Sequence, residues 1–154
     1  MQYLKTHYGR AINVIPSETI NIPNPANAGL SSITTDGDTN LLIDTSVTFT
    51  TNMMGNIVVA NGAIATVTGF TDEHTLVLSA DITPSDAISY TLYVPTPNEG
   101  CSIYFKERGN ITVLTVGGDV VTFKKCGDAN ASMILPVQVL RVISTELTDL
   151  IALW

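Results

Sequence analysis

The stretch ITVLTVGGDVVTFKK, residues 111–125, places two alternating apolar runs on either side of Gly117-Gly118-Asp119. A phosphate-binding Walker loop needs a lysine and then a helix after its glycines, because backbone N–H groups and the lysine must face the phosphates together. Here a second strand-like run follows, and Asp119 would repel a phosphate. Glycine adopts positive φ without steric cost, so the stretch predicts a turn between two antiparallel strands.

The middle of the chain shows the same period-two pattern in short runs. Each run is rich in valine, isoleucine, threonine or aromatic residues, which suit a pleated, half-buried surface. Asn61-Gly62 separates two of the runs, and Asn-Gly is the strongest short signal for a hairpin. Short strands joined by tight turns favour a small antiparallel barrel or sandwich. The predicted strands are residues 47–51, 56–60, 63–70, 75–80 and 89–94.

The last third of the chain also predicts strands. Residues 101–107, 111–116 and 120–125 are expected to form a three-stranded meander. Residues 134–144 and 149–154 are apolar enough to be inner strands, with Pro136 tolerated near the start of the first. Because chain ends usually fray, the terminal Trp154 suggests an end docked into a core or a neighbouring subunit.

Two proline-rich segments divide the chain. Each proline fixes its own φ and restricts the residue before it, so residues 15–29 and 94–100 should be extended rather than helical. We therefore expect an all-β protein with two parts. Residues 1–28 and 96–154 would form an antiparallel β-sandwich or barrel host domain, and residues 29–95 an inserted small antiparallel barrel or sandwich.

Charge is distributed unevenly along the 154 residues, which carry a net charge of −7. No lysine or arginine lies between Arg10 and Lys106, whereas nine acids do, so the middle carries −9 and the two ends together +2. The asymmetry suggests two units with different surroundings; chance in a lysine-poor chain is the alternative. The acidic balance argues against a nucleic-acid partner, which would need a basic stripe.

The hydropathy pattern argues against a membrane partner, because no run approaches the ~18 apolar residues of a membrane span. The first residues, MQYLKTHYGR, lack the apolar region of a secretory signal, so we expect a protein assembled in a cytoplasm. The two cysteines, Cys101 and Cys126, fit no metal spacing. Two reduced core thiols are favoured, and a disulfide is the alternative if their strands are neighbours.

Residues 36–47 begin like a calcium loop, with Asp36, Asp38 and Asn40 at alternate positions. The pattern then fails, because Leu41 replaces the glycine of the sharp turn and Val47 the bidentate glutamate. A solvated loop with Asx turns is the simpler interpretation. No metal ligand or cofactor-binding residue is predicted.

No catalytic constellation is predicted, so an enzyme is not expected. His7 and His74 lie far apart in the sequence, and the carboxylate pair Asp72-Glu73 falls at a turn where solvation explains it; His74 is expected to be exposed. The aromatic residues near predicted strands could stack on a sugar, but core or interface positions are favoured. They are Tyr90, Tyr93, Tyr104 and Phe105.

The order of these segments resembles small β-rich structural proteins of tailed bacteriophages, of the kind found in cyanophages and marine phages. In those proteins a Pro-Ser-Asp/Glu opening precedes a Gly-Gly-Asp hairpin and a closing pair of strands, and an inserted module is common. One departure is Ser144–Asp149, where the family has a glycine- and threonine-rich turn. The segments that carry the resemblance are VIPSETINIPNP (14–25), IYFKERGNITVLTVGGDVVTF (103–123) and ILPVQVLRVISTELTDLIALW (134–154), with LIDTSVTFT (42–50) and residues 56–82 in the insert.

The resemblance implies a virion protein, most of all a capsid decoration (cement) protein that binds the outer shell. Its implied partners are the major capsid protein or other virion proteins and further copies of itself in a homotrimer. A tail, baseplate or fibre protein, or a host-glycan attachment module, is the alternative. The host domain would be the shell-binding base and the insert would face outward. The candidate interface residues are Lys5, Arg10, Lys106, Arg108, Lys124, Lys125, Arg141 and Trp154.

Overall fold

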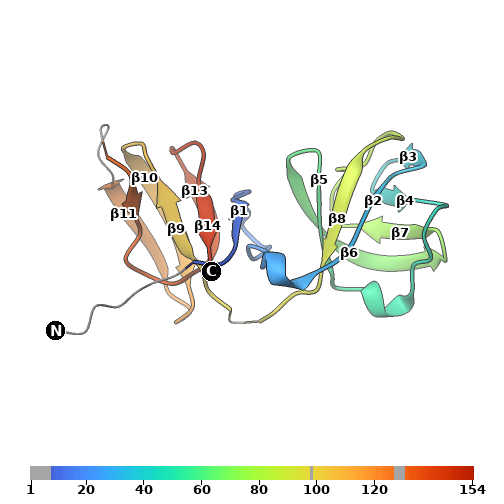
Figure 1. The fold of residues 1–154 in the computed structure, drawn as a ribbon, viewed down its shortest axis with the longest axis horizontal. Coiled ribbons are helices and arrows are strands. Elements are labelled where there is room, and N and C mark those ends of the chain that lie inside the picture. Colours follow the sequence, from blue (N-terminus) through green and yellow to red (C-terminus); the bar gives the residue numbers. More distant parts are fainter. Residues whose placement is uncertain (1–7, 98, 127–130) are drawn as a thin grey trace. The chain divides into compact units, whose positions relative to one another are not determined.

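The structure, a computed structural model, describes residues 8–97, 99–126 and 131–154 (Figure 1). These residues form antiparallel strands and two 3-10 turns, with no α-helix in this part of the chain. The all-β prediction is therefore confirmed. The chain divides into two compact units: unit 1 is Met1–Pro25 with Asn98–Trp154, and unit 2 is Ala26–Pro97. The divisions expected from the prolines, after residues 28 and 95, lie a few residues from these boundaries.

Unit 1 is a sandwich of two sheets, with strand orders β1-β14-β9-β12 and β11-β10-β13. Its core contains Ile103 and Ala152 from the first sheet and Val113 and Val142 from the second, all of them fully buried. The apolar faces of the two sheets therefore pack against each other. The strands are β1 (Ala11–Asn13), β9 (Ser102–Phe105), β10 (Gly109–Thr115), β11 (Val120–Cys126), β12 (Met133–Ile134), β13 (Val139–Thr145) and β14 (Ile151–Leu153).

Unit 2 is one bent sheet with the strand order β2-β8-β5-β6-β7-β4-β3. The first half of β6 pairs with β5 and its second half with β7, so the sheet turns over along this long strand. Val58 and Leu92 from one half meet Leu42 and Leu76 from the other in a single core. The strands are β2 (Ala28–Ile33), β3 (Asp36–Asp38), β4 (Leu41–Ile43), β5 (Ile57–Ala60), β6 (Ala63–Asp72), β7 (Thr75–Leu78) and β8 (Ser89–Tyr93); the 3-10 turns are η1 (Pro25–Asn27) and η2 (Thr51–Met53).

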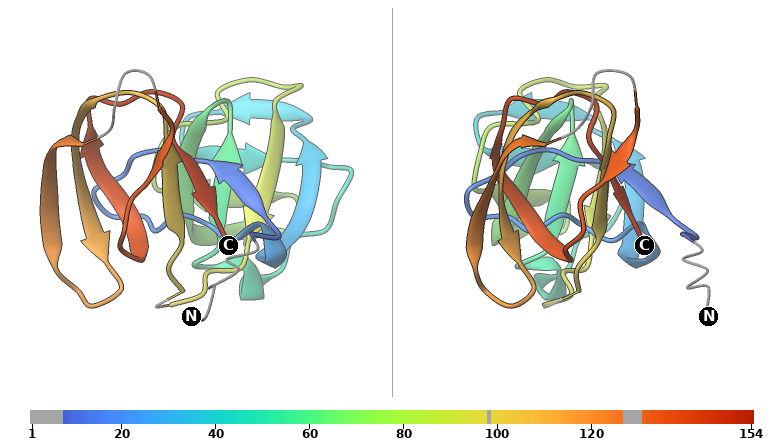
Figure 2. Two further views of the ribbon diagram at one scale, coloured as in Figure 1. Left: turned by 60° about the vertical axis from the view of Figure 1, so that its left-hand side comes forward. Right: turned by 90° about the vertical axis from the view of Figure 1, so that its left-hand side faces the viewer.

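Both predicted hairpins are present. Asn61 and Gly62 have positive φ between β5 and β6, and Gly118 has a φ of 90° between β10 and β11. Gly117-Gly118-Asp119 is therefore a turn (Figure 2). The predicted terminal strand is confirmed as β14, and the backbone N–H of Trp154 donates to the Arg10 carbonyl at 3.0 Å.

Some predicted pairings and strands are wrong. The expected meander fails because β9 pairs with β14 and β12, whereas β10 pairs with β11 and β13; the chain crosses to the other sheet at residues 106–108. Residues 134–144 are not one strand, since Pro136 lies between β12 and β13. Residues 47–51 form no ladder, although Phe49 is buried in the core of unit 2 and its N–H donates to the Glu73 carbonyl.

Candidate functional site

Exposed cations gather at one end of the sheet β11-β10-β13. Lys124 and Lys125 lie near the end of β11, and Lys106 and Arg108 lie in the crossing segment before β10. The pairing of Gly109 with Cys126 brings these two segments together. We call these four side chains the basic end of unit 1; all four are exposed, and none makes an ion pair within the described residues.

Local hydrogen bonds fix the backbone of the basic end. The Lys125 N–H donates to Asn110 Oδ1 at 2.9 Å, and Lys125 has a φ of 51° at a β-bulge, after which Cys126 pairs with Gly109. The nearby carboxylates of Glu107 and Glu146 accept hydrogen bonds from the backbone N–H groups of Thr148 and Asn110. These acids thus stabilise turns, while the cationic groups remain free to meet a partner.

The other candidate interface residues have different settings. Arg10 is exposed beside the C-terminal residue. Arg141 donates from its guanidinium to the Thr19 carbonyl at 3.0 Å and so holds the N-terminal segment. Trp154 is half-buried against the core of unit 1, and its indole N–H has no acceptor in the described part of the chain. Lys5 lies outside the described residues, as does His7.

A second candidate site is a hydroxyl-lined depression of about 650 Å³ in unit 2. Side-chain hydroxyls on neighbouring strands contact each other here, with 2.9 Å between Ser31 Oγ and Thr91 Oγ1. Because unit 2 has no lysine or arginine, the depression suits a neutral rather than an anionic ligand. It is lined by Ser31, Ser32, Ile33, Ser46, Val59, Ser89, Tyr90 and Thr91.

A fully buried carboxylate, Asp44, lies beneath these hydroxyls. Its Oδ1 accepts from the Ser46 N–H at 2.9 Å and from Ser46 Oγ at 2.5 Å, and its Oδ2 accepts from the Tyr90 hydroxyl at 2.8 Å. Burial raises the pKa of Asp44, but hydrogen bonds from Ser46, Ser32 and Tyr90 outweigh it and hold the pKa below its ordinary value. Burial, and then Asp44, raise the pKa of Tyr90, which remains the donor.

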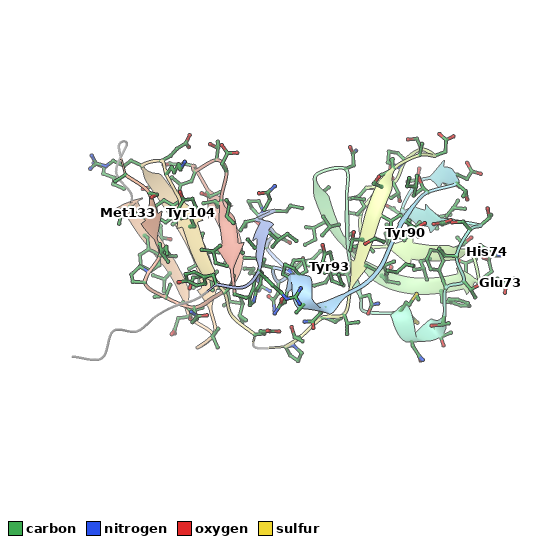
Figure 3. The ribbon with its side chains drawn as sticks, in the orientation of Figure 1. Glu73, His74, Tyr90, Tyr93, Tyr104 and Met133 are labelled. Atoms are coloured by element: carbon green, nitrogen blue, oxygen red, sulfur yellow. The ribbon has the colours of Figure 1, made fainter. Side chains whose placement is uncertain are left out.

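This network does not activate a nucleophile. The Ser46 hydroxyl donates a hydrogen bond to Asp44, but a carboxylate whose pKa is lowered is too weak a base to remove that proton. His74, which could serve as a base, instead lies with Nδ1 2.8 Å from the Val47 carbonyl oxygen and Nε2 3.6 Å from Glu73 Oε1. His74 lies beside Glu73 at the turn between β6 and β7, as expected, and its side chain is partly exposed, at 36% (Figure 3). The hydroxyls can bind a polar ligand, and the buried carboxylate holds the loop around Ser46.

The calcium-like stretch forms the β3-β4 hairpin. Asp36 Oδ1 accepts from the Gly37 N–H at 2.8 Å, Asp38 Oδ1 accepts from the Thr39 N–H at 2.6 Å, and Asn40 has a φ of 58° at the turn. Each of these carboxylates accepts from the N–H of the next residue. The Asx geometry, which uses the N–H two residues on, is found instead at Asp44 and Ser46, and Asp36–Ile43 is a pair of strands and not a loop. Within 8–97, 99–126 and 131–154, no group of three or more His, Cys, Asp or Glu side chains could hold a metal ion.

The aromatic and cysteine side chains belong largely to the cores. Tyr90, Tyr93 and Phe105 are buried, as the core interpretation predicts, while Tyr104 is half-buried on β9, where it pairs with Ile134 of β12 (Figure 3). Both thiols are free. Burial raises the pKa of Cys101 to about 12 and also raises the pKa of Cys126, so neither is a reactive thiolate.

A scan against protein-family models and searches of curated proteins and of solved structures each found no match to the chain. Of the helical turns that the structure describes, none is long and apolar enough to cross a membrane.

Proposed function

We propose that this protein is a structural component of a bacteriophage virion, a decoration protein that binds the outer capsid shell through unit 1. The observation that carries the proposal is the difference in charge between the units. Unit 2 contains seven acidic residues and no lysine or arginine, whereas unit 1 contains seven acidic and seven basic residues. The whole net charge of −7 therefore belongs to unit 2.

This difference would orient the protein on an acidic shell. The basic end of unit 1 would be attracted to carboxylates on the shell, and unit 2 would be repelled by them. Unit 2 would then face solvent, where its negative charge would keep particles apart. A role of this kind needs many strand ladders and a stable surface and no reaction chemistry.

Binding to undecorated shells tests the proposal. The protein should sediment with empty capsids of the virus that encodes it and saturate at a fixed number of copies per shell. It should also be a trimer by mass in solution or on the shell, where symmetric sites favour a symmetric oligomer. Binding to tails alone would contradict the capsid assignment.

Charge variants make the test specific. Replacing the four cations of the basic end with glutamine should weaken binding by about tenfold or more at low salt, since exposed charge pairs contribute roughly 0.2–1 kcal/mol each. The matched control replaces four exposed acids of unit 2 (Asp36, Asp38, Asp81 and Asp86) with asparagine, which changes the net charge by the same magnitude in the opposite direction and should not weaken binding. If the glutamine variants of unit 1 and the asparagine variants of unit 2 weakened binding equally, unit 1 would not be the shell-binding unit.

A second candidate function, attachment to a host glycan, is favoured by the hydroxyl-lined depression of unit 2. Its neutral hydroxyls and the apolar Ile33 and Val59 would meet a neutral sugar, while the seven acids of unit 2 would disfavour a sialylated one. The full chain on a glycan array should then bind neutral glycans only. Loss of that binding in Ser31→Val, with Thr122→Val of unit 1 as the control, would place the sugar in the depression.

A further inference from the structure

Strand β11 leaves one edge of its sheet uncovered. In the order β11-β10-β13, the outer edge of β13 is occupied by the N-terminal segment, since the N–H groups of Ser17 and Ile22 donate to the Val142 and Leu140 carbonyls at 2.9 and 2.8 Å. No described strand pairs with the outer edge of β11. An unpaired edge is a template for another strand.

The register of the hairpin shows which groups of β11 point outward. The Thr115 N–H donates to the Asp119 carbonyl at 2.9 Å, so these two residues form a hydrogen-bonded pair. Antiparallel pairs alternate between hydrogen-bonded and non-hydrogen-bonded. Counting along the register, the backbone groups of Val121 and Phe123 face β10. Those of Val120, Thr122 and Lys124 therefore face outward, which agrees with the 2.9 Å contact between the Thr122 and Thr112 hydroxyls in a non-hydrogen-bonded pair.

The side chains along this edge change character from one end to the other. At the hairpin end, Val120 is 63% exposed. Thr122 in the middle is exposed and uncharged, and Lys124 and Lys125 are exposed at the far end beside Arg108. An apolar start and a cationic end, on a strand with free backbone groups, define the chemistry of a complementary segment.

We propose that the outer edge of β11 binds an extended, acidic segment of a partner protein, which adds to the sheet as an antiparallel strand. Such a segment would place carboxylates opposite Lys124 and Lys125 and apolar side chains opposite Val120. The proposal deepens the proposed function, because it rests on a shell protein as the source of the segment.

Charge favours an acidic strand at this edge over a neutral strand, a basic strand or β11 of a second copy. Lysine on an edge strand commonly prevents pairing, because a neutral or basic strand would bury its charge without a partner. An antiparallel pair of two β11 strands centred on Thr122 would set Val120 against Lys124 of the other copy, which leaves each ammonium group without a counter-charge. A segment with carboxylates at its N-terminal end removes this cost.

Two probes test the inference with the full-length protein. The first is the peptide acetyl-EETVTVT-amide, with acetyl-KKTVTVT-amide as the matched control. At millimolar concentration, the acidic peptide should slow amide hydrogen exchange at Val120, Thr122 and Lys124 by about tenfold, whereas Val121 and Phe123 should be protected already in the free protein. The second probe is the undecorated shell, which should protect the same three amides.

Two variants separate the contribution of the Thr122 backbone N–H to peptide binding from that of the Thr122 side chain. Thr122→Pro removes an outward N–H that forms no bond within the sheet, so it should weaken binding of the acidic peptide by about tenfold, as expected for a lost hydrogen bond of about 1.4 kcal/mol. Thr122→Val keeps the N–H and should bind like the unchanged protein. If Thr122→Pro fails to fold, the exchange pattern of the unchanged protein decides.

The outcomes distinguish this inference from the proposed function. Shell binding without protection of the three amides overturns the inference and leaves the shell assignment standing. Protection by the acidic peptide without shell binding supports the inference and contradicts the shell assignment. Equal protection by both peptides, or a change in oligomeric state in Thr122→Pro with unchanged binding of the acidic peptide, overturns the inference.

Discussion

The two units bury their polar groups in different ways. In unit 2, the buried side chains of Asp44, Thr34 and Thr83 are all hydrogen-bonded; Thr34 Oγ1 donates to the Ser85 carbonyl at 2.9 Å and Thr83 Oγ1 to the Leu41 carbonyl at 2.6 Å. In unit 1, the core is largely apolar, and two buried nitrogen atoms, Arg141 Nε and Trp154 Nε1, have no partner among the described residues. Both units have apolar cores and loops fixed by side-chain hydrogen bonds, such as that of Asn24 to Glu99 in unit 1, but among the described residues only unit 1 has buried side-chain nitrogen atoms without a partner.

The same contrast separates the surfaces. The acids of unit 2 have no basic residue within the unit to offset them. Both units have edge strands, β11 in unit 1 and β2 and β3 in unit 2, but unit 1 also has exposed cations that are free of ion pairs in the described ranges. Unit 1 thus retains unused capacity for hydrogen bonds and charge pairing, which is why we assign the partner to it.

The largest expected effect is the loss of the buried carboxylate in unit 2. Asp44→Ala would leave the Tyr90 hydroxyl and the Ser46 groups without their acceptor, at a cost of about 3–5 kcal/mol in the free energy of unfolding of unit 2. Hydrogen exchange should accelerate in residues 26–97 and stay unchanged in residues 99–154. The exposed Asp86→Ala is the control. Equal acceleration in both units would show that they are not independent.

A cavity in the core of unit 1 should destabilise unit 1 itself, by a slightly smaller amount. Ile103 is fully buried between the two sheets, so Ile103→Ala should lower the stability of unit 1 by about 2–4 kcal/mol. Denaturant unfolding should shift the transition of unit 1 alone. Val120→Ala, at an exposed site, should change stability by less than about 0.5 kcal/mol. A shift in the transition of unit 2 would contradict the division.

Acid should destabilise unit 2 through Asp44. Its pKa is lowered in the folded state, so the stabilisation is complete above the ordinary aspartate pKa of about 3.9 and is lost as the pH falls through the folded value. The urea concentration needed to unfold unit 2 should therefore fall below about pH 4. In Asp44→Asn, that part of the pH dependence should disappear. An unchanged pH profile in this variant would mean that Asp44 is not the titrating group.

The smallest expected effect concerns the segment that covers β13. Arg141→Met removes hydrogen bonds from the guanidinium to the Thr19 carbonyl and Asn21 Oδ1, so it should cost about 1 kcal/mol. The amides of Ser17 and Ile22 should exchange faster, because their segment would leave the edge of β13. Arg10→Met is the control with the same loss of charge. Unaltered exchange at both amides would show that Arg141 does not hold the segment.

The sequence pattern predicts strands better than it predicts their partners. The Asn61-Gly62 and Gly117–Asp119 turns are local signals, and both hairpins are present. The partner of β9 is not a local property: β14, some 45 residues later in the chain, pairs with it because the apolar faces of two sheets must meet. The short strands β3 and β4 were missed because acidic residues and a turn interrupt their period-two pattern.

The polar network of unit 2 was also missed, although one signal of it is present. In Leu41–Asp44, the period of two places Asp44 on the same face as Leu42, and both are fully buried. An acid in phase with a core residue indicates a buried carboxylate that needs donors. Its donor Tyr90 lies far along the chain, so its contact with Asp44 follows from the fold and not from a local pattern.

A density map of shells saturated with this protein, at a resolution that traces the chain, would show which unit touches the shell. We expect residues 106–108 and the outer edge of β11 to contact the shell and unit 2 to make no contact with it. A map in which unit 2 lies against the shell while the basic end of unit 1 faces solvent would contradict this expectation.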